Sequence, residues 1–210
     1  MSTKTMEKLQ YISQGQTLAA QKDNILKALD AGVKWIQVRW KGAHQAYVYR
    51  LAEQVKNVCL RYGATCIIND HPAFAAAIDA DGVHLGLEDG SIAAARKLLG
   101  PGKIIGGTAN SFANVKQRIS EHCDYIGLGP FNYTTTKQKL SPLLGITGYE
   151  NIIQQVRREG LTPIPIFAIG GISQLEDIQR LLEIGVYGVA LSRIVTKTPN
   201  IVSSINKILL

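Results

Sequence analysis

Short runs of β-branched and other apolar residues alternate along the whole chain with stretches whose apolar residues recur at helical spacing. The runs predict strands at residues 9–13, 35–39, 65–69, 82–85, 103–107, 124–128, 165–169 and 187–191. The helix predicted after the second strand carries an apolar stripe formed by Tyr47, Leu51, Val55, Val58 and Tyr62. Strands that alternate with helices without a composition break favour a closed parallel barrel over an open sheet.

Two more helices are indicated by local signals. The segment after the seventh predicted strand begins with Ser173-Gln-Leu-Glu176, which matches a capping box. The last segment carries apolar residues on one helical face, at Ile201, Ile205, Ile208 and Leu209. The predicted fold class is α/β, a compact single-domain (β/α)₈ TIM barrel over residues 1–210, near the lower size limit of that fold.

Polar or glycine-rich clusters follow seven of the eight predicted strands. They are Gln37-Val-Arg-Trp-Lys41, Asn69-Asp70, His84-Leu-Gly86, Gly106-Gly-Thr108, Gly129-Pro130, Gly170-Gly171 and Ser192-Arg193. Because the carboxyl ends of barrel strands converge on one mouth, these residues are predicted to form a single site.

The first cluster combines an amide with two cations. Period-2 alternation turns Gln37 and Arg39 to one side of their strand and Val38 to the other. A strand-end glutamine can hydrogen-bond a heterocycle, whereas Arg39 and Lys41 can hold a diphosphate. The alternative is that these side chains are structural and are paired with carboxylates inside the barrel. This would account for Arg39, but it accounts poorly for Gln37, Arg39 and Lys41 together.

Gly170-Gly171 follows the seventh predicted strand, and Ser192 follows the eighth. The last two loops of such barrels often bind phosphate through backbone N–H groups. In isolation a glycine pair indicates only a turn, but at this place it predicts a phosphate site.

Asp70 ends the third predicted strand, and Asp89 lies just beyond the fourth. Each could cap the helix that follows it, because aspartate is a favoured N-cap residue. Both could also bind Mg²⁺, which prefers one or two protein carboxylates together with water and substrate phosphate. As neighbours at a phosphate-binding mouth they predict a magnesium site. His84 shows no metal spacing with the other histidines and is predicted to pack at its strand end.

Residues 129–147 form a long connection without apolar periodicity. Loops of this length in compact domains are usually functional. The connection follows the sixth predicted strand, so it is expected over the mouth, where Thr134, Thr136 and Lys137 would reach a bound substrate. A solvated threonine-rich loop is the alternative.

Composition narrows the classes of function. With 46% hydrophobic and 19% charged residues, the 210-residue chain is typical of a soluble globular domain with an ample core. It lacks the roughly 18 consecutive apolar residues of a membrane span, and its first residues do not match a secretory signal. Its three cysteines have no disulfide or zinc spacing, so a cytoplasmic location is predicted.

The formal net charge of +7 is spread along the chain without a basic run or an aromatic–basic stripe. A small polyanionic substrate is therefore predicted in preference to nucleic acid, and no membrane partner is expected. No Ser/His/Asp or Cys/His arrangement indicates covalent catalysis. The sequence leaves open whether the chain forms a homo-oligomer.

Together these motifs resemble thiamine-phosphate synthase across nearly the whole chain. The matching segments are Ile36-Gln-Val-Arg-Trp-Lys41, Ile67-Ile-Asn-Asp70, Ala80-Asp-Gly-Val-His-Leu-Gly86 with Asp89, Gly127-Leu-Gly-Pro130, Thr134-Thr-Thr-Lys137 and Ile169-Gly-Gly-Ile172. The resemblance implies a Mg²⁺-dependent transferase that joins hydroxymethylpyrimidine diphosphate to hydroxyethylthiazole phosphate, giving thiamine phosphate and pyrophosphate. It also implies a dissociative reaction, in which pyrophosphate leaves before the thiazole nitrogen attacks, so no nucleophilic side chain is expected.

The resemblance implies roles for individual residues. Asp70 and Asp89 would bind Mg²⁺, and Gln37 would contact the aminopyrimidine. The residues expected to hold the diphosphate are Arg39, Lys41, Asn69, Thr108 and Lys137. The residues expected to hold the thiazole phosphate are Thr134, Thr136, Gly171 and Ser192. Leu191 is a further expected substrate-binding residue. Arg39, Lys41, Thr108 and Lys137 are the expected catalytic residues.

Three departures from the family pattern concern substrate contacts. Leu87 stands where a glutamine is frequent, Thr108-Ala-Asn110 replaces Ser-x-His, and Phe131-Asn-Tyr133 replaces an apolar–aromatic–Pro run. Whether they alter specificity or activity is left open by the sequence. One alternative function is a thiazole tautomerase-like paralogue, which relies on a histidine at the position of Asn110. The other is a non-catalytic relative that only binds thiazole phosphate, which would not require Asp70, Asp89 and Lys137.

Overall fold

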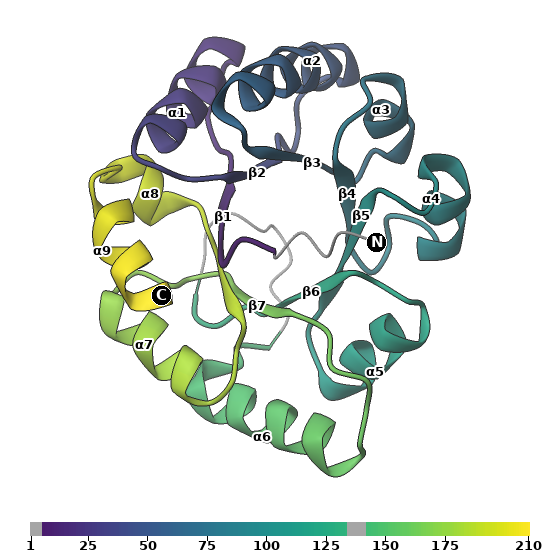
Figure 1. The fold of residues 1–210 in the computed structure, drawn as a ribbon, viewed down its shortest axis with the longest axis vertical. Helices are drawn as coiled ribbons and strands as arrows, with labels where there is room; N and C mark the ends of the chain where they lie inside the picture. Colours follow the sequence, from purple (N-terminus) through teal and green to yellow (C-terminus); the bar gives the residue numbers. More distant parts are fainter. Residues whose placement is uncertain (1–5, 134–141) are drawn as a thin grey trace.

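Eight parallel strands close into one barrel, in which each strand pairs with its sequence neighbours and β8 pairs with β1 (Figure 1). The computed structural model describes residues 6–133 and 142–210. The strands are β1 (Leu9–Ile12), β2 (Trp35–Val38), β3 (Thr65–Asn69), β4 (Gly82–Leu85), β5 (Ile104–Ala109), β6 (Tyr125–Leu128), β7 (Ile166–Ile169) and β8 (Gly188–Leu191). The predicted (β/α)₈ TIM barrel is confirmed, and β5 extends two residues beyond its predicted end.

The helices surround the strands as an outer ring (Figure 1). They are α1 (Leu18–Asp30), α2 (Gln45–Tyr62), α3 (Pro72–Ala77), α4 (Ile92–Leu99), α5 (Phe112–Ser120), α6 (Gly145–Arg158), α7 (Leu175–Glu183), α8 (Arg193–Lys197) and α9 (Ile201–Leu209). In the described parts of the chain, no helix is both long and apolar enough to cross a membrane.

The apolar stripe of α2 faces the sheet largely as predicted. Leu51, Val55 and Val58 are fully or almost fully buried, but Tyr47 is 55% exposed and lies outside the stripe. The helix ends at Gly63, whose left-handed backbone lets its N–H donate to the last carbonyl groups. Burial against the sheet and a glycine C-cap therefore define this helix.

The capping box predicted at Ser173 is wrong. Helix α7 begins at Leu175 with Gln174 as N-cap, and no side chain hydrogen-bonds to its first N–H groups. The chain turns away from β7 through Gly170 and Gly171, both with positive φ, which brings Ser173 to the barrel mouth instead of the helix start. Helix α6 begins at Gly145, inside the segment predicted as a loop.

The barrel interior is closed by a layer of large side chains, formed by Trp35, Ile67, Tyr125 and Phe167. The ring of Trp35 meets those of Tyr125 and Phe167 edge to face, at centroid distances of 4.9 and 5.0 Å. Tyr125 and Phe167 also line the cavity at the carboxyl end of the strands. This layer is therefore the floor of the cavity.

Candidate active site

A cavity of about 1140 Å³ opens at the carboxyl ends of the strands, and every strand contributes to its wall. The predicted site residues that line it are Gln37, Arg39, Lys41, Asn69, Asp70, Asp89, Thr108, Gly171, Leu191 and Ser192. The fold thus brings together residues that are widely separated in sequence. The remaining predicted site residues, Thr134, Thr136 and Lys137, lie outside the described residues.

Asp70 and Asp89 form a carboxylate pair at the ends of β3 and β4. Asp70 has a left-handed backbone with φ of 64°, and its N–H donates to the carbonyl of His84 at 2.9 Å. Asp89 accepts a hydrogen bond from the N–H of Gly86 at 2.9 Å. Neither aspartate is a helix cap, because His71 precedes α3 and Ser91 caps α4. Both carboxylates are therefore available to the cavity.

The pKa values of the two carboxyl groups depend on each other. Burial raises the pKa of Asp70 to about 6, and its hydrogen bond with Asp89 adds to the rise against the opposing effect of Lys41. Burial acts to raise the pKa of Asp89 too, but the hydrogen bond from Asp70 and the charge of Lys41 outweigh it and lower that pKa. Two acids this close cannot both ionise without a cation nearby.

Lys41 supplies part of that positive charge through an ion pair with Asp70. In residues 6–133 and 142–210, no group of three or more His, Cys, Asp or Glu side chains could hold a metal ion by itself. A pair of carboxylates suits a hard divalent cation that takes its remaining ligands from water and substrate oxygens. Asp70 and Asp89 fit such an ion.

Arg39 faces the same carboxylates from the end of β2. Burial lowers the pKa of its guanidinium, while the charges of Asp70 and Asp89 act to raise it. Its backbone is fixed to β1, because Ser13 Oγ accepts from the N–H of Arg39 at 2.9 Å. The end of β2 therefore contributes a cation beside the carboxylate pair. Arg39 and Lys41 together make this side of the mouth suited to an anion.

On the opposite side of the mouth, the segments that follow β6 and β7 are joined by backbone hydrogen bonds. The N–H groups of Phe131 and Asn132 donate to the carbonyls of Ile169 and Gly170, at 2.9 and 3.0 Å. Gly171 has φ of 80°, and a Cβ at this position would overlap the carbonyl of Asn132. Glycine is thus required both for the backbone conformation and for this close approach.

The turn after β7 directs three consecutive N–H groups to the cavity wall. Among the described residues, no acceptor takes the N–H groups of Gly171, Ile172 or Ser173, which all line the cavity. We call this segment, residues 171–173, the backbone turn. Consecutive unpaired N–H groups at a cavity wall suit an anion such as phosphate. Ser192 lies nearby at the end of β8, where its Oγ donates to Oε1 of Gln14 at 3.2 Å.

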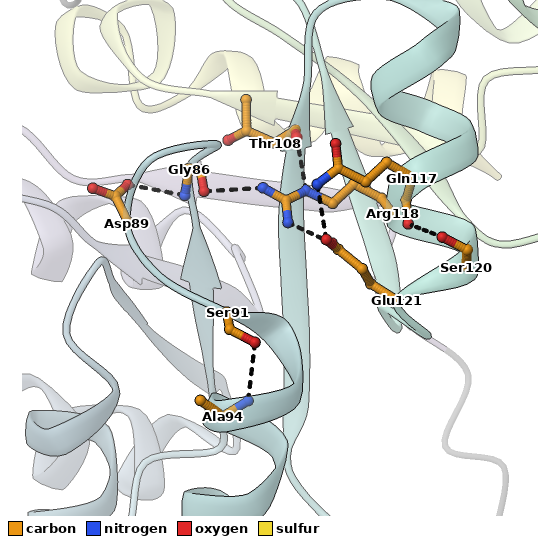
Figure 2. Close-up of polar contacts among 9 residues, drawn as sticks. All are labelled: Gly86, Asp89, Ser91, Ala94, Thr108, Gln117, Arg118, Ser120 and Glu121. Atoms are coloured by element: carbon orange, nitrogen blue, oxygen red, sulfur yellow. Dashed lines mark hydrogen bonds and ion pairs between the residues drawn. The ribbon is translucent and has the colours of Figure 1, made fainter.

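Arg118 of α5 joins the ends of β4 and β5 beneath the mouth (Figure 2). Its side chain is 2% exposed, and it donates from Nε to the carbonyl of Thr108 and from Nη2 to that of Gly86, both at 3.0 Å. Glu121 balances its charge at 2.6 Å. Gly107 makes room for it, because a Cβ there would lie 2.6 Å from Cδ of Arg118.

The residues that depart from the family pattern have different surroundings. Leu87, Asn110 and Tyr133 line the cavity, whereas Phe131 is buried against Tyr149. The side-chain amide of Asn110 donates to the carbonyl of Gly129, so it is engaged in holding the end of β6.

Several residues of the site were missed by the sequence prediction. Gln10 and Tyr125 are buried at the cavity floor, and Arg118 is buried behind it. The alternation within residues 9–13 could have turned Gln10 inward. Nothing in the sequence distinguishes Arg118 from a charged residue on the solvent side of its helix.

A closed barrel with cations, a carboxylate pair and backbone N–H groups at one mouth is typical of enzymes that act on small molecules. The sequence model of thiamine monophosphate synthase matches residues 9–195. The chain belongs to this family and is a transferase enzyme.

Individual relatives are similar over nearly their whole length. A thiamine-phosphate synthase of Flavobacterium psychrophilum is 54% identical over 203 residues, which cover 95% of this chain and 98% of that protein. One from Phocaeicola vulgatus is 44% identical and covers 100% of this chain and 99% of its own. The structure of thiamine phosphate pyrophosphorylase from Pyrococcus furiosus has a TM-score of 0.80 at 28% identity, covering 96% of this chain and 95% of that one.

Proposed function

We propose that this enzyme joins hydroxymethylpyrimidine diphosphate to hydroxyethylthiazole phosphate, forms thiamine phosphate and releases pyrophosphate, with Mg²⁺ as cofactor. The observation that carries the proposal is a cavity with two separate places for anions. One lies at the ends of β2 to β4, with Arg39, Lys41 and the carboxylate pair, and the other is the backbone turn after β7. In the closed barrel β3 and β7 are four strands apart, so the two places face each other.

The side with the carboxylate pair would bind the diphosphate. Asp70 and Asp89 would hold Mg²⁺, which neutralises charge on the leaving pyrophosphate and acts as a Lewis acid. The diphosphate oxygens would be bound by Arg39, Lys41, Asn69, Thr108 and, on the family resemblance, Lys137. Arginine and lysine there stabilise the negative charge that grows as the C–O bond breaks.

The remaining substrate parts would occupy the rest of the cavity. Gln37, at the floor, would hydrogen-bond the aminopyrimidine. The thiazole phosphate would accept hydrogen bonds from the backbone turn at Gly171, with Leu191 and Ser192 beside it, and with Thr134 and Thr136 assigned by the resemblance. The phosphate charge is then met by backbone dipoles and the thiazole is held against apolar wall residues.

This assignment needs no side chain to attack or to remove a proton. Departure of pyrophosphate leaves a pyrimidine methylene cation stabilised by the ring amino group, and the neutral thiazole nitrogen then forms the new C–N bond. The protein contributes orientation of the two reactants and charge stabilisation of the leaving group.

The tautomerase alternative is weakened by one observation. Asn110 stands where that reaction uses a histidine, and its amide is hydrogen-bonded to the carbonyl of Gly129. An asparagine amide is neither an acid nor a base near neutral pH, so it cannot relay a proton as a histidine does. The non-catalytic alternative leaves the partly buried carboxylate pair and its two cations without a role.

The test is an assay of purified enzyme with both substrates, in which thiamine phosphate is measured with Mg²⁺ and after its removal by EDTA. We expect product only with both substrates and the metal ion. A second reaction with the thiazole phosphate tautomer alone examines the tautomerase alternative. Product formation that is indifferent to EDTA would contradict the metal assignment, and no product under any condition would contradict the proposed function.

A further inference from the structure

Five buried polar side chains form one continuous hydrogen-bonded series across the cavity floor, from five different strands. We call it the floor relay, and its members in order are Gln37, Gln10, Tyr125, His84 and Thr108. The exposed fraction of each residue is 7% or less, and all five line the cavity. The relay thus connects Gln37 on β2, proposed to bind the pyrimidine, with Thr108 on β5, proposed to bind the diphosphate.

The first half of the relay has a defined direction. Nε2 of Gln37 donates to Oε1 of Gln10 at 2.9 Å, and Nε2 of Gln10 donates to the phenol oxygen of Tyr125 at 3.2 Å. The phenol proton of Tyr125 must then go elsewhere, and Nδ1 of His84 lies 3.0 Å away. Were Nδ1 of His84 protonated instead, it and Nε2 of Gln10 would both donate to the phenol oxygen, and the phenol O–H would lose its acceptor in the relay.

The second half follows from the chemistry of imidazole. A neutral histidine that accepts at Nδ1 carries its proton on Nε2. Nε2 of His84 lies 3.0 Å from Oγ1 of Thr108, so it donates to that hydroxyl. The hydroxyl of Thr108 cannot return a proton to His84, so its own hydrogen is left for a group in the cavity.

The relay ends carry opposite polarity. At one end Thr108 presents a donor, and at the other Gln37 has its Nε2 engaged and presents Oε1 as an acceptor. Each inner member donates to one neighbour and accepts from the other, so reversing one bond requires reversing all of them. Reversal would turn Thr108 towards His84 as a donor and would make Gln37 a donor to the cavity.

We propose that the floor relay fixes the hydrogen-bond polarity of the cavity, with Tyr125 and His84 as positioning residues that make Thr108 a donor and Gln37 an acceptor. The floor is therefore specific for a ligand that has an anionic oxygen beside Thr108 and an N–H donor beside Gln37. This second statement rests on the proposed function, because an aminopyrimidine diphosphate has both groups. The direction of the relay is a property of the free enzyme.

The direct test is the tautomer of His84 in the enzyme without substrate. Long-range ¹H–¹⁵N correlation spectra of ¹⁵N-labelled protein near pH 7.5 distinguish the two ring nitrogens, and His84→Gln assigns the signals. Should that variant not fold, substitution of the other three histidines, His44, His71 and His122, assigns His84 by elimination. We expect Nε2 protonated and Nδ1 bare. A proton on Nδ1, alone or together with one on Nε2, would overturn the proposal.

The second test breaks the relay at its centre with Tyr125→Phe. The matched control is Tyr187→Phe, which removes a phenol O–H that donates to the carbonyl of Met6 at 2.6 Å, next to the same aromatic layer but outside the relay. We expect Tyr125→Phe, but not the control, to give a mixture of His84 tautomers. It should also reduce, by about tenfold, the ratio of binding affinities between the aminopyrimidine diphosphate and an analogue without the amino group, as measured by calorimetry. An unchanged tautomer and an unchanged ratio of affinities would refute the positioning role.

The tautomer measurement and the activity assay separate this inference from the proposed function. The tautomer is measured without substrate, so it supports or refutes the relay even in an enzyme that makes no thiamine phosphate. An enzyme that makes thiamine phosphate but has Nδ1 of His84 protonated would leave the proposed function standing and remove the relay.

Discussion

Arg118 donates from Nη2 to the carbonyl of Gly86 at 3.0 Å, and the N–H of the same Gly86 donates to Asp89 at 2.9 Å (Figure 2). One residue thus lies between a buried guanidinium and a proposed cation ligand. A second bond, from Nε to the carbonyl of Thr108, ties the same guanidinium to the neighbouring strand. The relative positions of Asp89 and Thr108 therefore depend on a side chain behind the mouth.

Arg118→Met is expected to remove the donors that Arg118 supplies to these two carbonyls and to lower the free energy of unfolding by about 2–4 kcal/mol. It should also raise the Mg²⁺ concentration that gives half-maximal activity, because Asp89 is held less firmly. Urea unfolding and Mg²⁺ titration of the activity measure the two effects. Arg96→Met is the control, since Arg96 pairs with Asp124 and the carbonyl of Lys103 away from the cavity. An unaltered Mg²⁺ titration in Arg118→Met would show that Arg118 serves stability alone.

Asp70→Asn is expected to reduce turnover by roughly two orders of magnitude or more, because it removes part of a Lewis-acid site that contributes several kcal/mol. Asp89→Asn should act similarly. Asp79→Asn is a matched control, because Asp79 also has positive φ, at 50°, and pairs with Lys103 on the surface. Asparagine tolerates this backbone conformation, so the folds should persist. Steady-state rates over a range of Mg²⁺ concentrations are the measurement, and near wild-type rates in both active-site variants would exclude these ligands.

Gly171→Ala is expected to weaken binding of the thiazole phosphate, because the new methyl group overlaps the carbonyl of Asn132 and displaces the backbone turn. Its KM for that substrate should rise by about tenfold or more, the equivalent of one or two hydrogen bonds. Gly160→Ala provides the comparison, since Gly160 has φ of 60° but nothing within 4 Å of an added Cβ. Strain from positive φ affects both variants at about 1 kcal/mol, so only the first should show the KM effect. Equal KM values would argue against phosphate binding at Gly171.

Lys137→Ala is expected to slow pyrophosphate release while leaving the binding of thiazole phosphate intact, if Lys137 holds the diphosphate as the family resemblance implies. Single-turnover experiments with and without thiazole phosphate separate the two steps. Lys139→Ala, which removes a lysine two residues away, is the control for general loss of positive charge. Pyrophosphate release at the wild-type rate would remove Lys137 from the mechanism.

Local sequence patterns determined the order and type of the elements. Alternating apolar runs defined all eight strands to within one or two residues at each end, because strand and helix periodicities differ and are set by neighbouring residues. The same patterns located residues such as Arg39 and Asp70 at strand ends, and barrel geometry then predicted one shared mouth. The capping box at Ser173 failed because the glycines before it redirect the chain towards the cavity.

Tertiary structure alone decided what those residues meet. The pairing of Asp70 with Asp89, and the position of Gly171 against Asn132, depend on the register between strands, which no local pattern records. Arg118 is charged and helical in sequence, yet it is buried because Gly107 leaves space for it and three oxygen acceptors satisfy it. The floor relay likewise exists only once five strands are closed into a ring. Periodicity reports which side of an element faces inward, whereas partners across a barrel are set by long-range packing and hydrogen bonding.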